Sequence, residues 1–476
     1  MSPHADISKP FAALLALLAS CLPVLSADQP VVLTLDDYVT VATRQGIQSK
    51  LSNLTLQAAG YTREIAFRRT DSPAFALNRT DTKGETVYNG FPELSNSQQS
   101  SLTMNETTPL GTTVNASSRW AYYGGTIGPP SVDSIARPGF SANVTQPLYI
   151  FVKNPVKRTR QEADLNFANA KSVFHYTVLS LRAQARSLYY NIMLDAESVQ
   201  ADARKVASSE KLLAVTQALV DAGKSASVET MRAKIQFMDD QRQLQNDQVL
   251  MNQSILQAEN FANMSLNENV RFVTPLQFVP FTLPLDRLRQ YALLHNANLE
   301  LLRAAKELAR LAYEASVEPT RPTFALNGTY GSTDARTEPD YLTHGWTWTS
   351  TMNWLFFDSF VTRDQARNAR IAEWVADLNL QDAQRTIQVN VQSEYLDIKR
   401  TEKQIEDFKF SKEQAQRNVE VLRVRFQNGL AGLLDVLSAE DQMRGLENEY
   451  LRLLVQFNES KDQLSEQLGA EVETLE

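Results

Sequence analysis

SPAFALNRT at residues 72–80 returns as RPTFALNGT at residues 321–329, with six of nine residues identical at a shift of 249 positions. A second pair of related stretches, SLYYNI at 187–192 and SEYLDI at 393–398, is separated by a shift of 206. Similarity at a fixed spacing indicates an internal duplication. The sequence therefore predicts two structurally related halves.

The second shift continues through a pair of glycines and a pair of acidic residues. Gly223 matches Gly429, and Glu229 matches Asp435. The two shifts differ by 43, so the first half carries 43 extra residues between its motifs. These residues fall in the Gly-, Ser-, Asn- and Pro-rich segment around 82–139.

Each half is expected to begin with one helix, at about 35–70 or 285–318, and to continue into strands. Apolar and small polar residues alternate over 140–150, and Trp and Met alternate with Thr and Asn over 346–354. Such alternation is typical of a transmembrane barrel strand, although a half-buried soluble strand fits it equally well. The indoles of Trp346, Trp348 and Trp354 would suit an aromatic belt at a membrane interface.

Very long helices follow the strands. Residues 156–220 contain neither Pro nor Gly, which predicts a helix of roughly 97 Å, and residues 362–427 repeat the pattern. A glycine turn and a returning helix follow in each half, and the last helix has a coiled-coil seam. The expected division is a leader at 1–26, a first repeat at 27–272 with strands at about 72–150 and a helical hairpin at about 156–266, and a second repeat at 273–476 with strands at about 321–357 and a hairpin at about 362–468.

The chain has 476 residues, of which 43% are hydrophobic and 21% charged, and its net charge is −8. This composition excludes general disorder, and the negative charge disfavours a nucleic-acid partner. The apolar segment 11–18 predicts a signal peptide. Two cleavage sites remain open: a lipobox ending at Cys21, which would then be lipidated, or a small-residue site before Ala27, which would discard Cys21 with the leader.

About four strand candidates in each chain cannot close a membrane barrel, because the smallest such barrels have eight strands and open edges are not tolerated in lipid. Several chains must share one barrel, and three chains would give about twelve strands. Residues 98–122 read as an extra hairpin that turns at 109–111. Whether this hairpin joins the barrel stays open, and it puts the strand number in question.

The doubled order of motifs resembles the TolC-type outer-membrane efflux family over most of residues 30–470. The stretches that carry the resemblance are FQNGLAGLLDVLSA at 426–439, its weaker first-half copy at 220–229, ANVTQPL at 142–148 and TMNWLFFD at 351–358. The resemblance implies a mainly α fold with β structure, in which a trimeric β-barrel is continued by an α-helical coiled-coil tunnel. It also implies a homotrimer in outer-membrane lipid that extends into the periplasm.

By the same resemblance, the chain would be the passive exit duct of a tripartite efflux or type I secretion system for small molecules or proteins. A periplasmic adaptor and an inner-membrane pump would be its partners. The alternative is an elongated coiled-coil envelope scaffold without transport activity. No catalytic or phosphate-binding motif is found, so we expect neither an enzyme nor a cofactor or metal, and the acidic pair Asp239 and Asp240 reads as a solvated helix face.

The resemblance places a closing tip at the Gly223 and Gly429 turns. Asp435 and Glu229 fall at the family's acidic tip positions and could form a cation-selective ring, or they could simply be favoured at helix N-termini. Phe426 and Ala431 replace the tyrosine and arginine of the family's closing network. Leu430 and Leu433, with Leu434, could form a hydrophobic constriction instead, or they could be core residues of the helix pair.

Overall fold

The computed structural model describes residues 31–88, 91–126, 132–223, 226–264, 270–334 and 342–475. The expected leader 1–26, with Cys21, lies outside these residues. The chain forms two compact units. Unit 1 comprises Met1–Ile47, Leu181–Pro280 and Arg400–Glu459, and unit 2 comprises Gln48–Ser180, Phe281–Lys399 and Ser460–Glu476. Each unit draws on both halves of the sequence.

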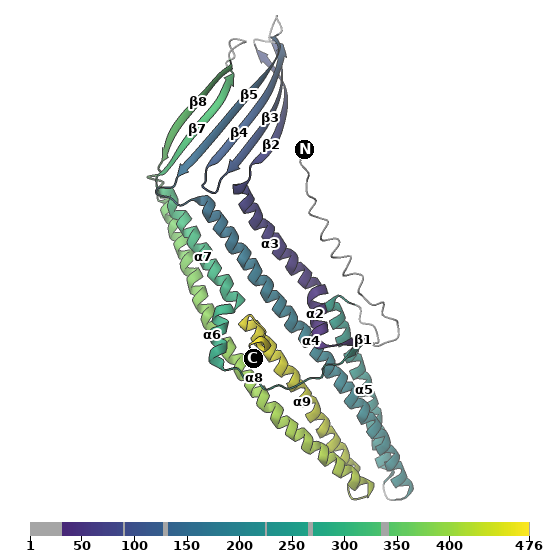
Figure 1. The fold of residues 1–476 in the computed structure, drawn as a ribbon. Coiled ribbons are helices and arrows are strands. Elements are labelled where there is room, and N and C mark those ends of the chain that lie inside the picture. The colour runs from purple at the N-terminus through teal and green to yellow at the C-terminus, as the bar shows by residue number, and fades with distance from the viewer. Residues whose placement is uncertain are drawn as a thin grey trace. The chain divides into compact units, whose positions relative to one another are not determined.

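Unit 2 contains one antiparallel sheet in the order β2-β3-β4-β5-β7-β8 (Figure 1). Its strands are β2 (Ala74–Tyr88), β3 (Phe91–Thr107), β4 (Thr113–Thr126), β5 (Val132–Leu148), β7 (Thr323–Asp334) and β8 (Leu342–Asn353). The expectation of about four strands is therefore wrong. The extra hairpin joins the sheet as β3 and β4, which pair with each other and with β2 and β5 on either side.

A tight turn at residues 108–112 connects β3 to β4. The Thr108 N–H donates to the Thr112 carbonyl at 2.8 Å, and Gly111 adopts a φ of +81°. A side chain at Gly111 would also collide with the Tyr149 phenol. Glycine is thus required both by the backbone conformation and by the close approach of Tyr149.

The sheet has one apolar and one polar face, because successive residues of a strand point to opposite sides. The register pairs Phe140 with Ser118 on β4, Tyr330 with Trp346 and Gly328 with Trp348 on one face. The other face is lined mostly by Ser, Thr and Asn residues. Alternation in the sequence therefore translates into two chemically distinct surfaces.

The helices expected at 35–70 and 285–318 are each broken in two. The structure has α2 (Leu35–Gln45) and α3 (Ile47–Asp71) in the first half, and α6 (Leu285–His295) and α7 (Ala297–Val317) in the second. Gly46 and Asn296 separate the pairs with extended ψ values of 139° and 125°. The Asn296 side chain caps α7 by accepting from two backbone N–H groups, which favours a new helix start.

Two long hairpins supply most of unit 1. Helices α4 (Pro155–Asp221) and α8 (Val361–Gln427) have 67 residues each, or about 100 Å, and contribute to both units. Helices α5 (Ser227–Ala262) and α9 (Leu433–Leu468) return from them. The short strands β1 (Val31–Leu33) and β6 (Val270–Phe272) pair in parallel. Among the described residues, no helix combines the length and apolar character needed to cross a membrane.

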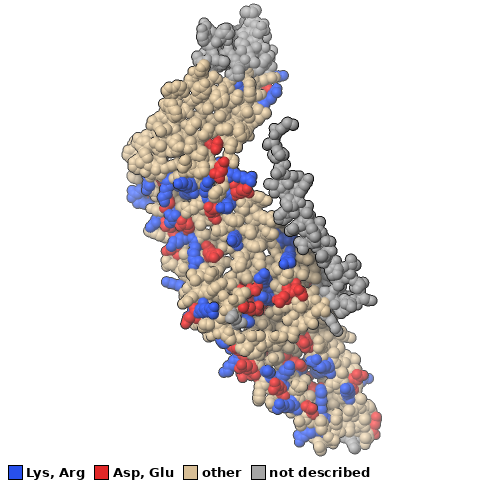
Figure 2. Space-filling view, viewed as in Figure 1, with Lys and Arg blue, Asp and Glu red and all other residues tan. Residues whose placement is uncertain are grey.

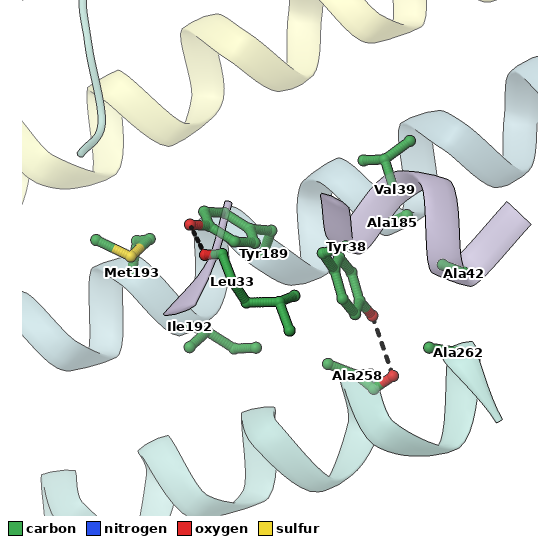
Figure 3. Close-up of a cluster of buried hydrophobic side chains, with 10 residues drawn as sticks. All are labelled: Leu33, Tyr38, Val39, Ala42, Ala185, Tyr189, Ile192, Met193, Ala258 and Ala262. Atoms are coloured by element: carbon green, nitrogen blue, oxygen red, sulfur yellow. Dashed lines mark hydrogen bonds between the residues drawn. The ribbon is translucent and has the colours of Figure 1, made fainter. Parts of the chain in front are cut away.

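A buried cluster ties β1 and α2 to α4 and α5 in unit 1 (Figure 3). The Tyr189 hydroxyl donates to the Leu33 carbonyl at 3.1 Å and accepts from the Thr274 N–H at 3.1 Å. The Tyr38 hydroxyl donates to the Ala258 carbonyl at 3.0 Å, and burial raises the pKa of Tyr38. The Tyr189 hydroxyl satisfies the Thr274 N–H, while the Leu33 carbonyl also accepts from the Val273 N–H at 3.4 Å.

Candidate functional site

Two glycine turns end the long helices α4 and α8. Gly223 and Gly429 have φ values of +69° and +74°, and a Cβ atom at either position would meet no neighbouring atom. At the second turn, the Gly429 N–H donates to Phe426 O at 2.9 Å and the Leu430 N–H donates to Arg425 O at 2.8 Å. This is the Schellman pattern, so the left-handed backbone conformation is what favours glycine here.

A small apolar core lies directly behind both turns. Phe426, Leu433 and Val436 are buried together with Ala233 of α5, and Leu219 of α4 packs against them. All four helices of the two hairpins contribute to this cluster. Gly223 and Gly429 therefore lie at the same end of unit 1, as the 206-residue shift suggests.

The leucines of the second turn differ sharply in burial. Leu433 is only 4% exposed, whereas Leu430 is 74% and Leu434 is 65% exposed. Leu433 therefore packs inside the chain with Phe426. Leu430 and Leu434 are the turn leucines that remain free to contact another molecule.

The two acidic residues occupy the same position, the third residue of a returning helix. The Asp435 carboxylate accepts the Gly432 N–H at 3.0 Å, which satisfies one of the free donors at the start of α9. Glu229 lies 3.0 Å from the Arg232 guanidinium in the first turn of α5. Both positions are favoured by the helix dipole, and the Asp435 side chain is exposed.

Unit 1 contains a buried charge network that the sequence did not predict. Asp202 of α4 is 2% exposed and lies 2.6 Å from Arg444 of α9, while Asp247 of α5 lies 3.8 Å from the same guanidinium. Burial raises the pKa of Asp202, the neighbouring Asp247 carboxyl raises it further, and Arg444 opposes both effects. The network links three helices through groups that are costly to bury without partners.

A lysine extends this network toward α5. Lys205 lies 3.1 Å from Asp240 and 2.8 Å from Asp441. Burial alone would lower the pKa of Lys205, but hydrogen bonds to Asp441 and Asp240 raise it overall. The interpretation of Asp240 as solvated is therefore wrong, because this carboxylate is 4% exposed. Its sequence neighbour Asp239 is exposed, as expected, and pairs with Arg242.

The apolar face of the sheet carries Trp346 and Trp348, and Trp354 directly follows β8. Trp346 and Trp348 are 72% and 70% exposed, and the Trp354 indole N–H donates to the Thr320 carbonyl at 3.1 Å. A Cβ atom on Gly328 would lie only 2.7 Å from the Trp348 ring. Gly328 therefore makes room for the indole to lie across β7.

The polar face is joined by side-chain hydrogen bonds across strands. Ser117 and Ser141 hydroxyls are 2.7 Å apart, and the Asn327 amide donates to the Thr351 hydroxyl at 3.3 Å. On the side in view, the sheet of unit 2 carries few charged side chains, while basic side chains gather where its strands meet the helices (Figure 2). This distribution suits a sheet with one face in lipid and one in water.

The described residues contain no group of three or more His, Cys, Asp or Glu side chains that could hold a metal ion.

Comparison with known proteins agrees with this architecture. A family model described as outer membrane efflux protein matches residues 109–260 and 288–470. A search of curated proteins found no match.

Several solved outer-membrane channels share the fold. The CmeC channel of Campylobacter jejuni is 13% identical, with 91% of this chain and 85% of that chain covered and a TM-score of 0.67. The open-state MtrE channel of Neisseria gonorrhoeae is 15% identical, with coverage of 92% and 89% and a TM-score of 0.69. The outer membrane protein VceC of Vibrio cholerae is 13% identical, with coverage of 92% and 96% and a TM-score of 0.69.

At these identities the solved structures establish the fold, while the family model covers well over half of the chain. The family consists of outer-membrane channels of efflux systems that extend into the periplasm. The chain therefore belongs to the outer membrane efflux protein family.

Proposed function

We propose that three copies of this chain form a passive exit duct with a shared β-barrel and a helical tunnel. The six-stranded sheet carries this proposal, because within the described part of the chain its two outer strands, β2 and β8, each have a neighbour on one side only. An unpaired strand edge is not tolerated within lipid, so neighbouring copies must supply the missing partners. The two repeats, 27–272 and 273–476, would be the evolutionary units of this duct.

The energy for transport would come from partners. A periplasmic adaptor and an inner-membrane pump are the expected ones, and the chain itself would have no enzymatic activity. Exposed apolar side chains on α5, including Met231, Ile235 and Met238, offer a contact surface on the returning helix. Such a surface is typical of helices that pack against further helices.

The turns at Gly223 and Gly429 would form the periplasmic tip. In a trimer, Asp435 and Glu229 would provide rings of carboxylates near the axis, and such rings favour cations. Phe426 cannot supply a hydrogen-bonding phenol, so apolar contacts of Leu430 would help to hold the closed tip. Leu433 would support the gate indirectly, through the core that shapes the turn.

Planar-bilayer conductance of purified protein tests this function. We expect heat-modifiable trimers in the outer-membrane fraction, ion conductance, and block by multivalent cations that weakens in Asp435→Ala. Asp239→Ala is the matched control, because Asp239 is an exposed carboxylate away from the turn. Absence of conductance in every variant would instead indicate an envelope scaffold and would contradict the proposed channel function.

Lipidation of Cys21 would add an anchor in the outer membrane. Cys21→Ser should then abolish incorporation of labelled palmitate. A mature N-terminus at Ala27, measured by intact mass, would contradict this anchor.

A further inference from the structure

The two edge strands of the unit 2 sheet, β2 and β8, run in the directions that antiparallel pairing between copies requires. All neighbours in the six-stranded sheet are antiparallel, so strand direction alternates from β2 to β8. With an even number of strands, β2 and β8 run in opposite directions. A β8 edge beside the β2 edge of another copy would therefore continue the antiparallel pattern.

The internal duplication provides a template for this joint, by which we mean the pairing of β8 with β2 of another copy. Within one chain, β5 ends the first half of the sheet and pairs with β7, which begins the second half. Strand β7 repeats β2 at the 249-residue shift, and β8 precedes α8 as β5 precedes α4 at the 206-residue shift. The contact between β8 and β2 of the next copy is thus the repeat equivalent of the contact between β5 and β7.

The same two shifts convert the known register of β5 with β7 into an expected register of β8 with β2 of the next copy. Thr145 pairs with Asn327 in the joint between β5 and β7. Moving Thr145 forward by 206 positions gives Thr351, and moving Asn327 back by 249 gives Asn78. Thr351 of one copy should therefore lie directly opposite Asn78 of the next.

This register matches the two faces of the sheet. On the apolar face, Leu77 would lie opposite Met352, and Phe75 opposite Trp354. On the polar face, Asn78 would lie opposite Thr351, a pair of the same residue types as the opposed Thr145 and Asn327 inside the chain. A slip of one residue would place apolar side chains among polar ones.

Charged groups on the β2 edge also find suitable neighbours. Arg79 and Asp81 pair with each other at 3.2 Å on the face that carries Phe75. In the translated register, Lys83 would lie opposite Trp346 and Glu85 opposite His344. A lysine over an indole and a carboxylate beside an imidazole are both favourable cross-strand pairs.

We propose that β8 of each copy pairs with β2 of the next in this register, so that three copies close an eighteen-stranded ring. This inference rests on the proposed trimer and specifies its membrane joint. Barrel diameter grows roughly linearly with strand number, so the ring would be about one and a half times as wide as one built from four strands per chain. The extra hairpin β3–β4 would therefore widen the duct at its membrane end.

Disulfide cross-linking between copies tests the joint. The background is Cys21→Ser, because Cys21 is the single cysteine of the chain. Asn78→Cys combined with Thr351→Cys should give a covalent trimer on a denaturing gel after oxidation or treatment with a short bis-thiol reagent. The matched control, Asn78→Cys with Thr347→Cys, keeps both thiols on the polar face but offsets them by four residues and should remain mostly monomeric.

The strand number is tested by a third pair. Ser117→Cys with Thr351→Cys joins β4 to β8 and should form no trimer if β2 is the edge. Strong cross-linking of this pair, or of the offset control in preference to the matched pair, would overturn the proposed joint. Native mass spectrometry of the same samples separates this failure from failure of the proposed function, since the trimer itself would persist in the first case and be absent in the second.

Discussion

The α8–α9 turn contains three leucines, so the effect of burial on local stability can be tested with one and the same substitution. Leu433→Ala, Leu430→Ala and Leu434→Ala each remove the same atoms, but Leu433 alone is enclosed by the core behind the turn. Removing a buried leucine side chain costs about 2–5 kcal/mol, whereas exposed substitutions usually change stability by less than about 0.5 kcal/mol. Leu433→Ala should therefore destabilise the tip selectively.

Hydrogen exchange measured by mass spectrometry reports this local stability. Because about 1.4 kcal/mol corresponds to a tenfold change in an equilibrium constant, a loss of about 3 kcal/mol should speed exchange in the α8–α9 turn about 100-fold or more. Amides around Tyr189, in the separate core of unit 1, serve as the internal reference. Leu430→Ala and Leu434→Ala should exchange at nearly the parental rate.

Equal acceleration by all three variants would refute this reasoning. It would mean that contacts outside the chain, and not the core around Phe426, hold the turn in place. No acceleration by Leu433→Ala would show that the tip does not depend on this core.

Three further predictions concern the turn, the charge network and the buried phenol. Gly429→Ala should destabilise the α8–α9 turn by about 1–2 kcal/mol, because its φ of +74° is strained for a residue with a side chain, and circular-dichroism melting or hydrogen exchange would detect the loss. The pKa of Asp202 is raised from 3.8, so the folded state holds this proton more tightly than the unfolded state. The contribution of Asp202 to stability should be greatest below pH 3.8 and decline as pH rises through the folded pKa. Protection of α4 amides from hydrogen exchange, measured against pH, should fall over the same range, and Asp202→Asn should flatten that fall. Tyr189→Phe should cost about 1–3 kcal/mol and speed exchange at Thr274, because the Thr274 N–H loses the hydroxyl that accepts from it and the Leu33 carbonyl keeps only its bond from the Val273 N–H.

The sequence alone determined the features that depend on local chemistry and on the duplication. The glycine turns could be located because Gly223 and Gly429 share one shift, and their positive φ values explain why glycine stands there. The long helices follow from stretches without Pro or Gly. The apolar face of β8 follows from alternating Trp and Thr, because successive strand residues face opposite sides.

Only the tertiary structure decided the features that depend on which distant segments pair. Strand β3 is polar on both faces over residues 97–101, so its alternation was too weak to show that β3 and β4 join the sheet. The burial of Leu433 beside an exposed Leu434 depends on where α4 and α5 pack, and no local pattern encodes that. Asp240 lies in the sequence beside the exposed Asp239, yet it is buried because Lys205, on a different helix, supplies the opposite charge that makes burial tolerable.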